Sequence, residues 1–169
     1  ALPSIDPPTR LLVGAGDKLI DFALLSRLVE RSRTEELDLA FLATPAQFGG
    51  ASAGRILTDG EGRPRAIAEI SDIRLRQARQ AALEHVQACA QKHVTWDELQ
   101  PIVAAQLGHK ASLGHLLGGG DFSAAEPYER DELLATLKRL PTAFDLGPDA
   151  DPISPEAASA APLHNESVY

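Results

Sequence analysis

The stretch of sequence that decides the fold runs from Ala53 to Asp72 and reads AGRILTDGEGRPRAIAEISD. Its two apolar runs, residues 55–57 and 65–70, have the composition of short β-strands. Between them, residues 59–62 read DGEG, and glycine and aspartate tolerate the positive φ angles of a tight turn. We therefore predict a β-hairpin whose second strand ends near Glu69, followed at once by a helix.

Two residues of this hairpin have the chemistry of a ligand site. Gly54 opens the first strand, and a glycine lets a ligand come close to the backbone. Glu69 closes the second strand, and its carboxylate can accept hydrogen bonds from hydroxyl groups. The pair suits a sugar-like ligand, although strand periodicity alone does not say whether one binds.

Composition excludes several functional classes. A net charge of −8 argues against nonspecific binding of nucleic acid, but it leaves room for a small phosphorylated ligand held by a few local donors. No run of 18 apolar residues is present, so we expect no membrane association. The single cysteine, Cys89, excludes an intrachain disulfide, and we expect a cytoplasmic protein.

The region before the hairpin alternates strand and helix patterns. Residues 11–14 form a short apolar run, and residues 37–43 (LDLAFLA) are apolar enough for a central strand. Between them, a helix is expected from the N-cap Asp21 to about Arg33. Its inner face is predicted to consist of Phe22, Leu25, Leu28 and Val29. This β-α-β order predicts a Rossmann-like α/β first half.

The region after the hairpin is predicted to be helical. A helical pattern runs for more than twenty residues from Ser71, a Thr95–Glu98 capping box begins a second helix, and residues 128–140 form a last one. From Asp145 onward Pro, Ala, Ser and acids dominate, which predicts an irregular tail. The expected organisation is an α/β region over 1–72, a helical region over 73–140 and a tail over 141–169.

Three groups of residues are candidates for binding charge. Asp17 follows a strand by a glycine turn and could hold Mg²⁺ at the carboxyl end of the sheet, or merely cap the next helix. Lys18 could contact a phosphate, or be an ordinary exposed lysine. Arg74, Arg76 and Arg79 could meet an anion at the start of the long helix, or form a solvated face.

The order of these motifs resembles the sugar-phosphate nucleotidyltransferases of GT-A-like fold, a family that includes uridylyltransferases acting on N-acetylglucosamine 1-phosphate. The resemblance covers about residues 10–73. It rests on Gly16-Asp17, the helix 22–33, the strand 37–43, Gly54-Arg55-Ile56, Asp59-Gly60 with Gly62, and Glu69 with Asp72.

The resemblance implies that Asp17 holds a catalytic Mg²⁺, that the backbone of Gly54 approaches the sugar, and that Glu69 binds sugar hydroxyls. In such enzymes a sugar 1-phosphate attacks the α-phosphate of a nucleoside triphosphate and releases pyrophosphate. The glycine-rich nucleotide loop of the family has no counterpart in this sequence, so another segment or protein chain would have to bind the nucleotide. The alternatives are a non-catalytic binding or regulatory subunit that keeps the fold, and an unrelated small α/β enzyme.

Overall fold

The computed structural model contains the predicted hairpin. Strand β2 (Gly54–Thr58) pairs antiparallel with β3 (Pro64–Ala68), and Arg55 lies opposite Ala68. The structure describes residues 21–37, 40–48, 53–119 and 127–165. They belong to two units, residues 1–43 with 166–169 and residues 44–165.

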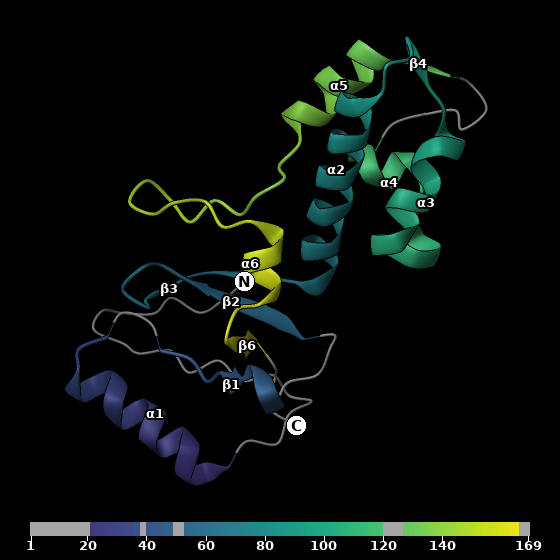
Figure 1. Cartoon of the computed structure of the whole chain (residues 1–169). Helices are drawn as coiled ribbons and strands as arrows, with labels where there is room; N and C mark the ends of the chain where they lie inside the picture. The colour runs from purple at the N-terminus through teal and green to yellow at the C-terminus, as the bar shows by residue number, and fades with distance from the viewer. Residues whose placement is uncertain (1–20, 38–39, 49–52, 120–126, 166–169) are drawn as a thin grey trace, which may run out of the picture. The chain divides into compact units, whose positions relative to one another are not determined.

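The sheet of the second unit is antiparallel and has the strand order β1-β6-β2-β3 (Figure 1). Strand β6 (Leu163–Asn165) lies between β2 and β1 (Thr44–Pro45), so the end of the chain fills the middle of the sheet. The prediction of a parallel, Rossmann-like sheet is therefore wrong. The predicted strand at 37–43 is wrong for its described part, since residue 37 and residues 40–43 form no strand. The predicted strand at 11–14 lies outside the described residues.

The region predicted to be an irregular tail contains regular structure. Helix α6 (Pro155–Ser159) precedes β6 and packs against β2 and α2 (Ile70–Ala88). The small side chains of Pro155 and Ala158 are fully buried there, because short side chains allow the segment to approach its neighbours closely. A buried cluster joins this segment to the hairpin and to the start of α2; its members are Leu57, Ala68, Ile73, Phe144, Leu146 and Ala158.

The expected helical region is confirmed. Around α2 lie α3 (Trp96–Leu107), α4 (Leu113–Leu117) and α5 (Arg130–Arg139), as Figure 1 shows. The Thr95 capping box is present, with both of its reciprocal hydrogen bonds. Short elements complete this region: η1 (Ala46–Phe48), η2 (Gly108–Lys110), and the strand pair β4 (His93–Val94) and β5 (Tyr128–Glu129). The core of the helices is built mainly from Ala78, Ala82, Val86, Val94, Leu99, Val103, Leu116 and Leu137.

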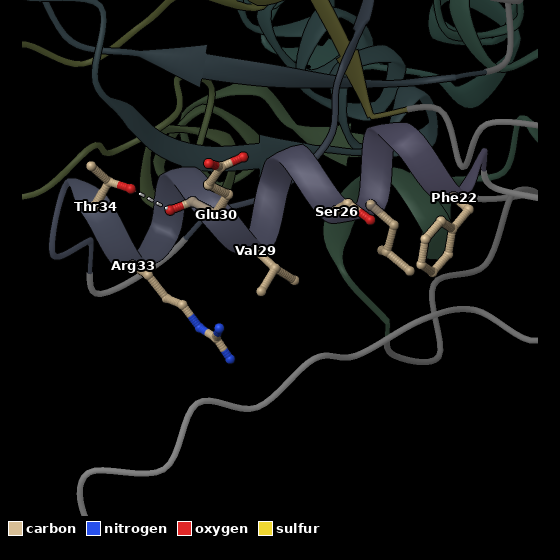
Figure 2. Close-up of a pocket in the computed structure, with 7 residues that line it drawn as sticks. Phe22, Ser26, Val29, Glu30, Arg33 and Thr34 are labelled. Atoms are coloured by element: carbon tan, nitrogen blue, oxygen red, sulfur yellow. Dashed lines mark hydrogen bonds between the residues drawn. The ribbon is translucent and has the colours of Figure 1, made fainter.

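Helix α1 (Phe22–Thr34) is the described element of the first unit, and Asp21 caps it by accepting hydrogen bonds from Ala23 N and Leu24 N. Of the face predicted to point inward, Leu25, Leu28 and Val29 are half-buried, whereas Phe22 is 81% exposed, and no side chain of α1 is fully buried. Figure 2 shows Phe22, Val29 and Arg33 projecting from the same side of the helix. The described residues that line a shallow hollow along this helix all belong to α1. No described helix of the chain is long and apolar enough to span a membrane.

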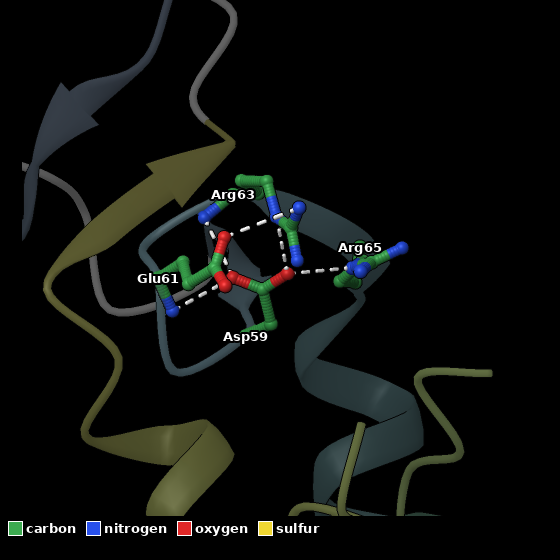
Figure 3. A network of polar contacts seen from close by, with 4 residues as sticks. All are labelled: Asp59, Glu61, Arg63 and Arg65. Carbon is green, nitrogen blue, oxygen red and sulfur yellow. Dashed lines mark hydrogen bonds and ion pairs between the residues drawn. The ribbon is translucent and has the colours of Figure 1, made fainter. Parts of the chain in front are cut away.

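Asp59 organises the turn of the hairpin (Figure 3). Its Oδ1 accepts hydrogen bonds from the backbone N–H groups of Glu61 (3.0 Å) and Arg63 (2.9 Å). Its Oδ2 accepts from Nε of Arg63 and Nε of Arg65, each at 2.8 Å. Burial by itself raises the pKa of the Asp59 carboxyl, but these hydrogen bonds outweigh burial and hold the pKa well below its ordinary value of 3.8. Gly62 supplies the positive φ angle, +76°, that the turn requires.

Replacing Asp59 by asparagine is expected to destabilise the protein near neutral pH and to weaken its sensitivity to acid. Because the pKa of Asp59 is lower in the folded chain, its stabilising effect is present above about pH 4 and is lost as the pH falls toward the folded-state pKa. Urea unfolding at about pH 6 and about pH 3 measures the free energy of unfolding of both proteins. The difference in this free energy between wild type and Asp59→Asn should be smaller at about pH 3 than at about pH 6.

Asp145→Asn is the matched control for this prediction. Among the described residues, the Asp145 carboxylate accepts one hydrogen bond, from Gly147 N at 2.8 Å, and pairs with no arginine. If the difference in free energy of unfolding between wild type and Asp59→Asn is the same at both pH values, the hydrogen bonds from Arg63 and Arg65 do not have the stabilising role assigned to them.

Candidate functional site

The structure brings two of the predicted site residues together. A Cβ atom at Gly54 would lie 3.2 Å from Oε2 of Glu69 and 3.2 Å from the carbonyl oxygen of Ala68. The Glu69 side chain therefore lies directly against the backbone at position 54, which any side chain there would disturb. Glu69 is the N-cap residue of α2 rather than the last residue of a strand. The other two predicted residues, Asp17 and Lys18, lie outside the described residues.

The predicted magnesium site depends on Asp17. Within the described ranges, no three His, Cys, Asp or Glu side chains gather closely enough to hold a metal ion. Gly54 and Glu69 supply one carboxylate between them, and a protein site for Mg²⁺ with bound phosphates uses one or two. Magnesium binding stays a prediction.

A groove of about 920 Å³ lies beside the first turns of α2. Its walls come from β2, α2, the end of α3 with η2, α4 and α6. We call it the basic groove, because its ionisable lining residues are Arg55, Arg74, His109, Lys110 and His115. No Asp or Glu of the described part of the chain lines it. This volume is within the range of sites that bind small molecules.

Arg55 is the buried basic residue of the groove, and only 7% of its surface is exposed. Its Nε donates to the carbonyl oxygen of Ser159 at 3.3 Å, and its Nη1 donates to the carbonyl oxygens of Ala53 and Gly54. No described carboxylate pairs with it. A buried cation without an anionic partner is costly, so an anion in the groove would offset that cost.

The start of α2 adds further affinity for an anion. Ile70 and Ser71 of its first turn line the groove, and no side-chain hydrogen bond from Glu69 caps that turn. Free N–H groups at the start of a 19-residue helix favour a negatively charged ligand. Arg74 and Gln77, one and two turns further along, lie on the same face and also line the groove.

The three arginines predicted to cluster at the start of α2 make different contacts. Of the three, Arg74 lines the groove and forms no hydrogen bond or ion pair with any described residue. Arg76 donates from Nη1 to the carbonyl oxygen of Ala143 at 2.5 Å, and its guanidinium lies 4.2 Å from the ring centre of Phe144. Arg79 is buried and donates from Nε to the carbonyl oxygen of Leu116 at 2.9 Å. Burial lowers the pKa of Arg79.

Sequence reasoning did not connect Arg55 with the residues near position 110. Arg55 lies in a strand, while Lys110 and His115 follow a helix more than fifty residues later. The packing of α3 on α2 is what places them around one groove. The available signal was the scarcity of acids between Pro101 and Gly120, a stretch that contains two histidines and a lysine.

Comparison with known proteins adds no family to this description. No family model, no curated protein and no solved structure matches the chain. The resemblance to sugar-phosphate nucleotidyltransferases therefore stays a prediction, and the function is inferred from the geometry of the basic groove and its surroundings.

Proposed function

We propose that this protein binds a small phosphorylated ligand in the basic groove. The observation that carries the proposal is the lining of the groove, where five basic side chains meet without a described carboxylate. The chain as a whole has a net charge of −8, so the groove differs in sign from the average surface. Such a local concentration of positive charge attracts anions into the groove.

The donors in the groove suit a phosphate group. A phosphate has several acceptor oxygens, and arginine side chains bind it through paired, charge-assisted hydrogen bonds. Arg55 is held in place by three carbonyl oxygens, while Arg74 and Lys110 are exposed and can close on a ligand. The Ser71 hydroxyl and the first turn of α2 provide uncharged donors.

A sugar phosphate is the ligand class that the neighbouring residues favour. Gly54 directly precedes Arg55, and Glu69 directly precedes Ile70, so both residues of the Gly54–Glu69 contact are chain neighbours of residues that line the groove. The exposed Glu69 carboxylate can accept hydrogen bonds from hydroxyls while the basic side chains bind the phosphate. This division of roles agrees with the substrate that the resemblance implies.

The proposal has a catalytic and a non-catalytic version, which differ in whether the chain takes part in a reaction or only binds the ligand. In the catalytic version the chain is the sugar-binding half of a nucleotidyltransferase, and Mg²⁺ held by Asp17 would stabilise charge at the reacting phosphate. In the other version the protein is a binding or regulatory subunit. With Mg²⁺, a nucleoside triphosphate and a sugar 1-phosphate, release of pyrophosphate by the chain with its partner supports the first version, and binding without release supports the second.

Calorimetric titration of the full chain tests the proposal itself. We expect N-acetylglucosamine 1-phosphate to bind at least about tenfold more tightly than N-acetylglucosamine, because one charge-assisted hydrogen bond contributes roughly that factor. Inorganic phosphate should compete, and added salt should weaken binding through screening. Equal affinity for the sugar with and without its phosphate would contradict the proposal.

A further inference from the structure

We propose that residues 154–165 and the ligand of the basic groove stabilise each other through Arg55. We call these residues the C-terminal strap; they comprise the Ser154 cap, α6 and β6. The inference rests on the proposed function, because it describes how binding at that same groove is regulated. According to this inference, the groove has all of its walls only when the strap is docked.

The strap is docked on the elements that form the groove. Helix α6 packs against α2 and β2, and β6 pairs with β2 so that His164 lies opposite Arg55. Ser159, the last residue of α6, lines the groove. Removing the strap would therefore open one wall of the groove and expose the middle of the sheet.

Arg55 links the strap to the ligand. Its Nε donates to the carbonyl oxygen of Ser159, which belongs to the strap, while its other hydrogen bonds are to the carbonyl oxygens of Ala53 and Gly54, the two residues that precede it. The Ser159 contact is thus what orients the guanidinium with respect to α6. When the strap is docked, this cation is already positioned for an anion in the groove, which reduces the cost of binding.

The strap consists of short elements with small side chains. Its helix has five residues and its strand has three, and alanines at positions 157, 158, 160 and 161 give it little apolar surface. Such short elements depend on tertiary contacts and open locally at a lower free energy than global unfolding. A ligand that prefers the docked state shifts this equilibrium, and by reciprocity a docked strap increases the affinity for the ligand.

Amide hydrogen exchange of the ligand-free full chain tests the link directly. Arg55→Lys keeps the positive charge but removes the Nε donor to Ser159, so we expect exchange in residues 155–165 to be roughly tenfold faster than in wild type. Arg139→Lys is the matched control, because its Nε also donates to a carbonyl, that of Ala135 in its own helix. Unchanged exchange of the strap in Arg55→Lys would overturn the inference.

The second measurement uses wild-type protein with N-acetylglucosamine 1-phosphate at saturation. We expect exchange in 155–165 to slow several-fold, while exchange in the middle of α2 stays the same. Binding detected by calorimetry without slower exchange in the strap overturns this inference and leaves the proposed function standing. Absence of calorimetric binding overturns the proposed function, and with it the coupling to a ligand.

Discussion

Exchanging both Arg74 and Lys110 for glutamine is expected to weaken the binding of N-acetylglucosamine 1-phosphate by about 100-fold. Each residue contributes an exposed positive charge to the basic groove, from α2 and from η2 respectively. A charge-assisted hydrogen bond to a phosphate contributes about a factor of ten or more, and solvent screening of exposed groups keeps the estimate at the low end. Calorimetric titration of the double variant measures the loss.

The control is the double variant Lys138→Gln with Arg139→Gln. This variant also loses two positive charges, but from an exposed part of α5 that does not line the groove. Its affinity should stay within about twofold of wild type, because neither side chain lines the groove and salt screens exposed charges. An equal loss of affinity in both double variants would mean that net charge, rather than the basic groove, determines binding.

Replacing Leu99 by alanine is expected to lower the free energy of unfolding by about 3 kcal/mol. Leu99 is fully buried in the helical core, where it belongs to the cluster shared by α2, α3, α4 and α5. Truncation removes three carbon atoms, Cγ and both Cδ, from apolar surroundings and leaves a cavity that the helices fill only in part. Urea unfolding followed by circular dichroism measures the change.

Leu24→Ala is the control for this substitution. Leu24 is 42% exposed on α1, so the same truncation should change stability by less than about 0.5 kcal/mol. A loss at Leu99 no larger than the loss at Leu24 would contradict the assignment of Leu99 to the core. Because both variants lose the same atoms, the difference between them measures burial alone.

Local sequence patterns predicted the local elements well. The turn residues from Asp59 to Gly62 predicted a hairpin, and the structure contains β2, β3 and the Asp59 network. The Thr95–Glu98 pattern predicted a capping box, and both of its hydrogen bonds are present. These signals succeed because the interacting groups lie within a few residues of one another, so tertiary packing has little influence on them.

The first half was misjudged because alternating strand and helix patterns do not reveal strand partners. The order β-α-β predicted a parallel sheet, whereas β2 pairs antiparallel with β3 and with β6, which lies more than one hundred residues later. The strap was misjudged because its composition, rich in Pro and Ala, is also that of disordered segments. Small side chains with little apolar surface become a buried layer only when a sheet and a helix are there to receive them.

The sequence by itself determined the hairpin, the capped helices and a net charge of −8. It also indicated Gly54 and Glu69 as a pair, and the structure places them in contact. Only the tertiary structure decided that Arg55, Arg74 and Lys110 share one groove and that the strap completes it. The physical reason is range: hydrogen bonds of turns and caps join near neighbours, whereas a groove is formed by the packing of distant segments.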